Sequence, residues 1–367
     1  MNAAHIEAML RAAIIDEAYP GAAYAYGTCD DAHIGFVGHL TYTSESTPTS
    51  EETFWDLASV SKVIGVTTLA MRWVNDGRLD IDRPVADVIP EFGVRGKEAI
   101  TIKQLLLHES GLIPFRRYHE TLTRPEDVRA EILAEPLQYR PGTQSHYSDL
   151  SMIVLAIVME RIGAASLPTM LHDEVFNLIG MKSTAFCAGH PVAPTSRVEP
   201  WRREIHRLRG VEHESEFIQG EVHDPTAFLL GGIAGHAGLF STIGDMVLFA
   251  QSMLKVELVR PEIQSLFTTV VSDLSTRALG WDTKDPVNSS AGRKFGAKSY
   301  GHTGYTGTSL WIDPEAGYFA ILLSNRVHPS EDNGNIVTVR PRFHDAVMEC
   351  LDAGISPDGP TQSAAEE

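Results

Sequence analysis

The apolar residues near the start of the chain recur at the spacing of a helix. They lie at i, i+3, i+4 and i+8, as Ile6, Met9, Leu10 and Ile14. This pattern predicts an amphipathic helix over residues 4–18, which Pro20–Gly21 interrupts. Two apolar runs follow, 22–28 and 33–42, separated by two aspartates, and they predict a β-hairpin.

Helical patterns dominate the middle of the chain. Residues 61–76 predict a buried helix that ends at Gly77. Further helical patterns lie at 101–107, 126–134, 149–162 and 166–178. The segment Thr242–Asp245 is typical of a capping box and opens a helix that runs to about Leu254. Strand-like runs follow at 277–282, 307–313 and 317–324, and a last helix is expected from about 342 to 352.

The order of these elements predicts the fold class. A helix and strands come first, helices follow, and strands and a helix close the chain. We therefore expect an α/β (α+β) fold whose sheet is completed by both ends of the chain. Its α/β part would comprise about 1–76 and 242–352, with a mainly helical insertion over about 77–241. The tail, 353–367, is expected to be disordered.

The charge balance narrows the range of partners. The chain carries 30 Lys and Arg against 48 Asp and Glu, a formal charge of −18. Such a field repels phosphate backbones and anionic membrane surfaces, so nucleic acid and membranes are not expected partners. Charged residues interrupt the N-terminal apolar positions, and no apolar run reaches about 18 residues. These features predict a cytoplasmic protein, or a mature secreted form without its signal peptide.

Cysteines and histidines form no recognisable disulfide or metal pattern. The three cysteines lie far apart, at Cys29, Cys187 and Cys350. We expect isolated thiols in a reducing compartment, with a catalytic thiol as the alternative. No metal-binding spacing links His206, His213 and His223. We therefore expect no metal and no cofactor.

The segment 201–210 is a basic island in this acidic chain. Its arginines are Arg202, Arg203, Arg207 and Arg209. The favoured interpretation is a solvated loop, partly offset by Glu199 and Glu204. The alternative is a roof over a cleft that attracts an anionic group on a substrate.

The first chemical motif is the S-x-x-K of Ser59–Lys62. If Ser59 starts the predicted helix, Lys62 lies one turn on, where its amine can take the hydroxyl proton. To act as a base near neutrality, Lys62 needs a pKa below the usual value of about 10.4. The alternative is an ordinary N-cap with a solvated lysine. We interpret a second copy, Ser252–Lys255, as chance, because it falls at the end of a predicted helix.

A second motif brings a hydroxyl and a carboxylate together. Residues 141–149, PGTQSHYSD, place Tyr147 and Asp149 two positions apart, after a Pro-Gly turn and before a predicted helix. Such a loop can project both side chains into a cleft. The alternative is structural: Tyr147 packs, and Asp149 caps the next helix.

A third motif is rich in glycine. In residues 301–309, GHTGYTGTS, three glycines allow a ligand to approach a strand edge closely. Backbone N–H groups there could bind an oxyanion or pair with an extended substrate. A plain glycine-rich hairpin is the alternative.

Together, and in this order, the three motifs resemble those of the penicillin-recognising serine hydrolases: S-x-x-K, Y-x-N or a variant, and K-T-G or a variant. The chain is most similar to the class C β-lactamase-like group, which includes DD-peptidases and esterases. Three further segments fit this resemblance: 101–112, 231–241 and 301–314. The resemblance extends over about 5–350. It implies a β-lactamase/transpeptidase-like fold, an antiparallel sheet flanked by helices, in one catalytic domain over 1–352.

The resemblance also implies roles for individual residues. Ser59 would be the nucleophile, Lys62 its proton acceptor, and Tyr147 would shuttle a proton between Ser59 and the leaving group. The backbone N–H groups of Ser59 and Tyr305 would form the oxyanion hole. The substrate-binding and oxyanion residues would be Asp149, His302, Thr303, Gly304 and Tyr305. Of these, His302 and Thr303 would line the strand side and touch the substrate. Two histidines in family-like turns are expected to fix loops: His108 and His236.

Two departures from the family pattern matter. Asp149 stands where many relatives have Asn; it can still bond Lys62, but its charge favours the protonated amine. His302 replaces the lysine of the third motif, and a histidine is only partly charged near neutrality. A fixed cation there helps to hold the carboxylate of a β-lactam, so an efficient β-lactamase is disfavoured.

The expected function is therefore metal-free acyl transfer. Ser59 attacks a carbonyl, the leaving group departs with a proton, and water hydrolyses the acyl-enzyme. The partner would be a small ester or peptide, the substrate of an esterase or of a D-Ala peptidase or muropeptide amidase. The alternatives are a weak β-lactamase and a catalytically silent ligand-binding protein on the same fold.

Overall fold

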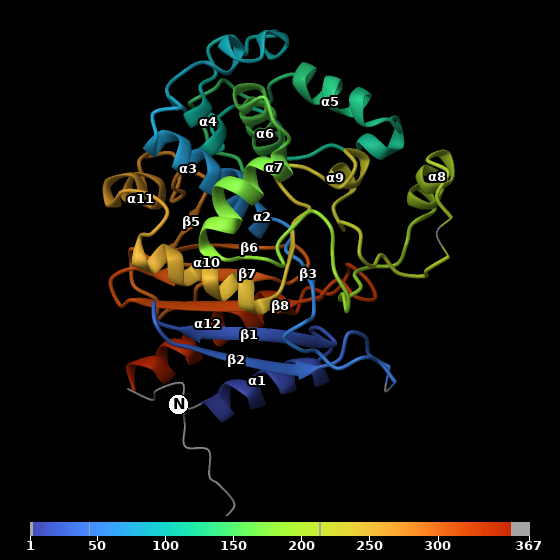
Figure 1. Cartoon of the computed structure of the whole chain (residues 1–367), viewed down its shortest axis with the longest axis vertical. Helices are drawn as coiled ribbons and strands as arrows, with labels where there is room; N and C mark the ends of the chain where they lie inside the picture. Colours follow the sequence, from blue (N-terminus) through green and yellow to red (C-terminus); the bar gives the residue numbers. More distant parts are fainter. Residues whose placement is uncertain (1–2, 44, 213, 354–367) are drawn as a thin grey trace, which may run out of the picture.

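A six-stranded antiparallel sheet forms the base of the molecule (Figure 1). The computed structural model describes residues 3–43, 45–212 and 214–353. The strand order β2-β1-β8-β7-β6-β5 pairs the first strands of the chain directly with the last one. The strands are β1 (Gly21–Gly27), β2 (Ala32–Gly38), β5 (Asp282–Thr283), β6 (Tyr300–Thr303), β7 (Ser309–Asp313) and β8 (Tyr318–Ser324). Both chain ends thus complete the sheet, as the order of elements predicted.

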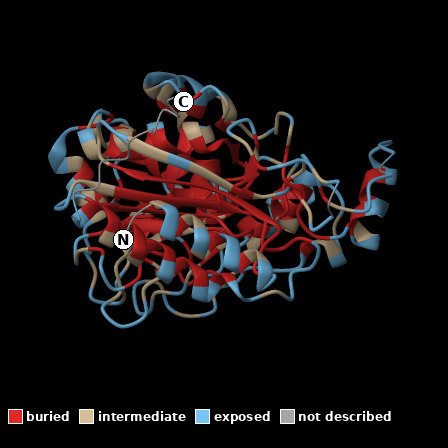
Figure 2. Ribbon diagram, turned by 90° about the horizontal axis from the view of Figure 1, so that it is seen from below, coloured by how far each residue is buried: buried red, intermediate tan, exposed pale blue. Residues whose placement is uncertain are grey.

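Helices cover both faces of the sheet. Helices α1 (Ala3–Ile15) and α12 (Ile336–Asp352) pack together on one face, and α10 (Ile243–Lys255) lies on the other, against β1 and β8 (Figure 1). Every residue of β1 is buried, because its alternate side chains enter two different cores. Figure 2 shows this continuous buried layer through the sheet and the inner sides of the helices.

The helical half of the molecule stands on the α10 face of the sheet (Figure 1). Its α-helices are α2 (Val60–Lys62), α3 (Thr68–Asn75), α4 (Ile102–Leu106), α5 (Pro125–Ala134), α6 (Asp149–Gly163), α7 (Leu167–Leu171), α8 (Pro200–Leu208), α9 (Pro225–Leu229) and α11 (Pro261–Thr268). Helix α6 is its centre, since all its residues from Leu150 to Met159 are buried. A two-stranded sheet of β3 (Trp55–Asp56) and β4 (Phe240–Ser241) lies beside α2. The division into an α/β part and a helical insertion within one domain remains our proposal.

Most predicted elements are confirmed, but the helix over 61–76 is broken. Short α-helical segments, α2 and α3, flank a π-helical turn, Val63–Thr67. Gly65 inside that turn has φ −96° and ψ −108°, outside the helical region. The side chains of Leu239 and Leu171 approach this glycine. Leu171 and Leu239 are far from Gly65 in the sequence. The local pattern of residues 61–76 therefore does not reveal this break in the helix.

Three further predictions were wrong in extent or type. Residues 277–282 form a loop, except for Asp282 at the start of β5; their apolar side chains are buried without being in a strand. Helix α12 begins at Ile336 rather than near 342 and continues through Pro341. The segment 201–210, favoured as a solvated loop, contains helix α8, which begins at Pro200. Apart from Ala353, the tail expected to be disordered, 353–367, lies outside the described residues.

Within the described ranges, no single helix is both long and apolar enough to cross a membrane. One bent pair, α6 with Leu167–Ile179, satisfies the criterion jointly by length and composition, with an 80° bend between its parts. The α6 part of this pair is packed in the core.

Candidate active site

Ser59 lies at a turn between β3 and α2. The residue before it, Ala58, has a positive φ of 46°, a conformation that is costly for a residue with a side chain. The buried carboxylate of Asp56 holds this turn. Its Oδ1 accepts the Ala58 N–H at 2.8 Å, and its Oδ2 accepts the His223 N–H at 2.6 Å. These bonds fix the backbone that presents the Ser59 hydroxyl at the start of α2.

The Lys62 ammonium is surrounded by three oxygen atoms. It donates to Ser59 Oγ at 2.8 Å and to the His236 carbonyl at 2.9 Å. It also lies 2.7 Å from Oδ1 of Asp149, and its side chain is completely buried. Serine, lysine and aspartate of the first two motifs are thus in direct contact.

The charge state of Lys62 agrees with the effect predicted for Asp149. Burial lowers the pKa of Lys62, but the Asp149 carboxylate and Tyr147 raise it, and the net shift is upward. The lowered pKa that a basic lysine requires is therefore absent, because the charge beside the amine is negative. In the resting site Lys62 is an ammonium that donates to Ser59.

Tyr147 is enclosed by rings and cations. Lys62 Nζ lies 4.9 Å from its ring centroid and Arg277 Cζ lies 4.8 Å from it. The rings of His108 and His302 are 4.7 and 5.8 Å away, centroid to centroid. The Tyr147 hydroxyl is buried, and its polar neighbours are the Lys62 ammonium and the Ser59 hydroxyl. Burial raises the pKa of Tyr147, against the opposing effect of Lys62, so the hydroxyl keeps its proton and can donate it.

The third motif is tied directly to the turn that precedes the nucleophile. The Thr306 hydroxyl donates to the Asp56 carbonyl at 2.7 Å, and the Thr308 hydroxyl donates to the Leu57 carbonyl at 2.9 Å. A Cβ on Gly304 would lie 2.5 Å from the Leu57 carbonyl oxygen. Only glycine allows the two loops to approach this closely.

The backbone N–H groups of Ser59 and Tyr305 lie on these two joined loops. Neither group donates a hydrogen bond within the part of the chain that the structure describes. Two arginines hold the second loop in place: Arg326 donates to the Tyr305 carbonyl at 2.7 Å, and Arg340 donates to the Gly304 carbonyl at 2.5 Å. Two unpaired donors on fixed loops are what an oxyanion hole requires.

His302 and Thr303 lie on β6. Nδ1 of His302 donates to the Thr303 carbonyl at 2.8 Å, and the His302 side chain is buried. Burial, with the nearby charges of Lys62 and Arg277, lowers the pKa of His302 well below its usual value. The partial charge expected for this histidine is therefore wrong: it is neutral near pH 7 and does not supply the cation of the family motif.

Three arginines line the cleft beside the nucleophile. A cleft of about 380 Å³ opens beside Ser59 and Tyr147 and is lined by Arg277, Arg326 and Arg340. Arg277 pairs with Asp282, which also lines the cleft. The other two guanidinium groups donate to backbone carbonyls. No sequence motif indicated these arginines, because they come from a loop, from the residues after β8 and from α12.

A buried network supports Lys62 from the helical half. His236, whose carbonyl accepts from Lys62, has Nε2 2.8 Å from Oδ1 of Asp224. Arg202 of α8 donates to the carbonyls of residues 222 and 223 at 3.1 and 2.8 Å. Arg202 is only 1% exposed, so this part of the basic island is neither a solvated loop nor a roof over the cleft. The two hydrogen bonds of Arg202 fix the segment that leads to Asp224.

The other histidines singled out from the sequence take structural positions. Nδ1 of His108 accepts the Ser148 N–H at 3.1 Å, which agrees with a role in fixing a loop. His206 pairs with Glu221, and His223 Nε2 lies 3.3 Å from Glu331. His213 lies outside the described residues.

Ligand-type atoms do come together at one point near the site. Those of Asp149, Asp224 and His236 lie within 4.8 Å of one another, but Lys62 already pairs with this Asp149. The absence of a metal and of a cofactor stays a prediction. Cys29, Cys187 and Cys350 are free thiols.

The second S-x-x-K lies within α10. Its Ser252 donates to the Phe249 carbonyl at 2.8 Å, and its Lys255 pairs with Asp30 at 3.6 Å. Ser252 and Lys255 therefore contact other residues and do not form a pair like that of Ser59 and Lys62.

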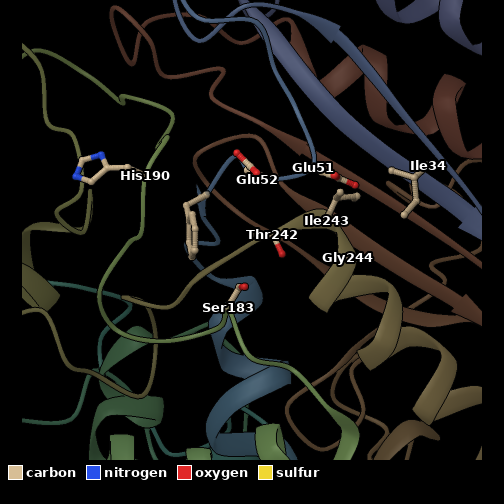
Figure 3. Close-up of a pocket in the computed structure, with 9 residues that line it drawn as sticks. Ile34, Glu51, Glu52, Ser183, His190, Thr242, Ile243 and Gly244 are labelled. Atoms are coloured by element: carbon tan, nitrogen blue, oxygen red, sulfur yellow. The ribbon is translucent and has the colours of Figure 1, made fainter.

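A larger cavity of about 510 Å³ lies at the start of α10 (Figure 3). It shares no lining residue with the cleft at Ser59. Glu51 and Glu52 lie on one wall, and Ser183 and Thr242 on another (Figure 3). Its lining includes Ser183 but no lysine or tyrosine of the kind that accompanies Ser59, so the smaller cleft is the candidate active site.

The geometry around Ser59 defines a class of enzyme, the serine hydrolases that pass through an acyl-enzyme. A family model described as Beta-lactamase matches residues 6–340, and the chain therefore belongs to the beta-lactamase family. Within that family it is a serine hydrolase of the β-lactamase-related group, as the three motifs predicted.

Two sequence relatives and one solved structure are similar to this chain. An N-acetylmuramyl-L-alanine amidase of Bacillus subtilis is 30% identical over 320 residues, 77% of this chain and 71% of the relative. An Escherichia coli K12 protein, provisionally named D-alanyl-D-alanine carboxypeptidase, is 29% identical over 75% of this chain and 70% of its own length. The solved structure of EstCE1, a hydrolase with promiscuous acyltransferase activity, has a TM-score of 0.73 at 20% identity, covering 94% and 98% of the two chains. The fold predicted from the motifs is confirmed.

Proposed function

We propose that this hydrolase cleaves an amide or peptide bond in small peptides of the cell-wall type, and that it selects substrates with a free carboxylate. The observation that carries this proposal is the arginine lining of the cleft beside Ser59. A cationic cleft in a chain of charge −18 concentrates anionic ligands, and guanidinium groups match carboxylates in geometry. The names of the amidase and carboxypeptidase relatives point to the same kind of substrate.

In this proposal each site residue has one role. Ser59 attacks the carbonyl carbon, and its N–H together with that of Tyr305 binds the oxyanion. Tyr147 donates a proton to the leaving nitrogen, which suits a buried hydroxyl that keeps its proton. Arg277, whose guanidinium lies over the Tyr147 ring, holds the carboxylate of the substrate. His302, Thr303 and Gly304 line the bound peptide.

An esterase is the second candidate, favoured by apolar groups at the mouth of the cleft. Tyr305 and Val337 line the cleft and are 52% and 69% exposed. Such surfaces can hold the acyl chain of an uncharged ester. A weak β-lactamase and a silent ligand-binding protein remain as further outcomes of the test. A small ester or peptide partner and a cytoplasmic or mature secreted location are also proposals.

The experiment compares one peptide ending in D-Ala-D-Ala with its C-terminal amide, together with p-nitrophenyl acetate and nitrocefin. We expect kcat/KM to be at least about tenfold higher for the free carboxylate than for the amide. A tenfold difference corresponds to about 1.4 kcal/mol in the activation free energy. Equal rates for the two peptides contradict carboxylate selection. Turnover of the ester alone favours the esterase, and turnover of nitrocefin alone favours the β-lactamase. Ser59→Ala is the control for every substrate.

A further inference from the structure

The Lys62 ammonium donates two hydrogen bonds and forms one close ion pair. A lysine ammonium has three N–H groups, and three oxygens surround this one: Ser59 Oγ, the His236 carbonyl and Asp149 Oδ1, at 2.8, 2.9 and 2.7 Å. While Nζ donates to Ser59 Oγ, it cannot accept the proton of that hydroxyl. A proton must therefore leave Nζ before Ser59 can be activated by Lys62.

The three oxygens differ in their ability to take this proton. A backbone carbonyl is not a useful base, and Ser59 is the group that must lose a proton. Asp149 is the one carboxylate in the set, and its side chain is 23% exposed, so it is partly shielded from water. It is also held in place, since its N–H donates to the Pro114 carbonyl at 2.9 Å and the preceding Ser148 caps α6.

We propose that Asp149 is the internal proton acceptor that converts Lys62 from a donor into the base for Ser59. This rests on the proposed acyl-enzyme function and deepens it. In this step Asp149 acts through Lys62 and not on the substrate. It is therefore a positioning residue, and it controls where the proton of the Lys62 ammonium lies. The asparagine that many relatives have at this position could orient the lysine but could not hold the proton.

The proton balance closes over the acylation step. The resting pair is ammonium and carboxylate. One proton moves from Nζ to Asp149 Oδ1, which leaves an amine and a carboxylic acid. The Ser59 Oγ–H bond then breaks as the Oγ–C bond forms, and that proton goes to Nζ. When the C–N bond of the substrate breaks, the leaving nitrogen takes a proton through Tyr147, and Lys62 or Asp149 restores the tyrosine, so the resting pair returns.

The proposal has a definite pH signature. The active enzyme carries one proton shared between Lys62 and Asp149, and activity is lost on the acidic side when the pair binds a second proton. Other charged or titratable groups face this pair, and they are unchanged in a variant of Asp149 alone. They are Tyr147, His108, His302, Arg277, Asp224 and His236.

The test is the pH profile of kcat/KM for Asp149→Asn beside the wild type. In the variant only the neutral amine of Lys62 can act, so the acidic limb must rise towards the lysine range. We expect an upward shift of at least about 2 pH units, because a carboxyl and an ammonium normally titrate about 6 units apart. An unchanged limb overturns the proposal. So does a downward shift, since loss of the negative charge lowers the pKa of a lysine that acts alone.

Two controls keep this result separate from the proposed function. If turnover of Asp149→Asn is too slow, the rate of fluorophosphonate adduct formation on Ser59 is followed against pH instead and must show the same shift. Asp173→Asn, at a side chain that is 63% exposed, should leave the profile unchanged. A wild-type enzyme that forms no adduct contradicts the acyl-enzyme function itself, whereas adduct formation with an unshifted limb contradicts only the role of Asp149.

Discussion

The Thr308 hydroxyl donates a hydrogen bond to the Leu57 carbonyl at 2.9 Å, although the two residues are 251 positions apart. This bond joins the loop that carries the third motif to the turn that carries Ser59. It holds the Ser59 and Tyr305 N–H groups in a fixed relation, without any contribution from a substrate. The pair of donors is therefore preorganised, which is the condition under which an oxyanion hole accelerates acyl transfer most.

The close approach of these loops predicts the effect of Gly304→Ala. The added Cβ would meet Thr308 Oγ1 at 2.0 Å and the Leu57 oxygen at 2.5 Å, so the loops must separate. We expect kcat to fall by ~10²–10³, the usual loss when one oxyanion donor is displaced. Gly244→Ala is the matched control, because its Cβ meets no atom within 4 Å. A Gly304→Ala enzyme within about threefold of wild type contradicts this account of the loop.

Carboxylate recognition by Arg277 is tested by Arg277→Gln. We expect kcat/KM for the free-carboxylate peptide to fall by ~10–100-fold, because a hydrogen bond to a charged group contributes about 1.5–3 kcal/mol. The C-terminal amide should change by less than about threefold, since it lacks that charge. Steady-state kinetics on both peptides provide the measurement, with Arg207→Gln, at a side chain that is 71% exposed, as the control. A parallel loss on both peptides would assign Arg277 to the fold instead.

The buried position of Arg202 predicts a loss of stability in Arg202→Gln. Its guanidinium is bonded to two backbone carbonyls, and removal leaves those oxygens buried without a donor. We expect the free energy of unfolding to fall by about 1–3 kcal/mol in urea denaturation. The exposed Arg207→Gln should stay within about 0.5 kcal/mol of wild type. Equal stability of the two variants would mean that α8 contributes nothing to the segment it contacts.

Buried neutral histidines predict acid instability. Burial lowers the pKa of His344 from 6.5 to about 3. Below pH 6.5 the unfolded chain binds a proton at this histidine that the folded chain does not, so stability falls as the pH falls. The slope from one such group reaches about 1.4 kcal/mol per pH unit. Burial shifts the pKa of His108 and His302 in the same direction.

The variant His344→Gln checks this pH dependence. Between pH 6 and about 4.5 we expect the slope of unfolding free energy against pH to decrease by about 1.4 kcal/mol per unit relative to wild type. The absolute stability of the variant is not the readout, because the change also removes buried contacts. His172→Gln, at a side chain that is 69% exposed, should leave the slope unchanged. An identical slope in the His344 variant would show that this histidine is protonated in both states.

The site residues that could be predicted are those that lie in short sequence motifs. Ser59 and Lys62 are one helical turn apart, so local geometry alone brings them together. Tyr147 and the 301–309 loop join them only through the fold, and here the resemblance to a known family supplied what spacing could not. The predicted hairpin and the strands β7 and β8 follow from short apolar runs, and in β1, β7 and β8 nearly every residue of these strands is buried.

What could not be predicted depends on contacts between distant residues. Arg277 sits in an apolar run that suggests a strand, yet its guanidinium pairs with Asp282 and covers Tyr147. Arg202 sits in a segment rich in charge, yet it is buried because three oxygens from 221–223 surround it. None of these contacts produces a periodic pattern of apolar residues in the sequence.

The most direct test of the account is the intact mass of the protein after incubation with a fluorophosphonate probe and, separately, with a penicillin. We expect a single adduct with the fluorophosphonate, which is absent in Ser59→Ala. A penicillin adduct at the same residue would add support for a peptidase-type site over a plain esterase. An adduct that persists in Ser59→Ala, or no adduct with either probe, would contradict Ser59 as the nucleophile.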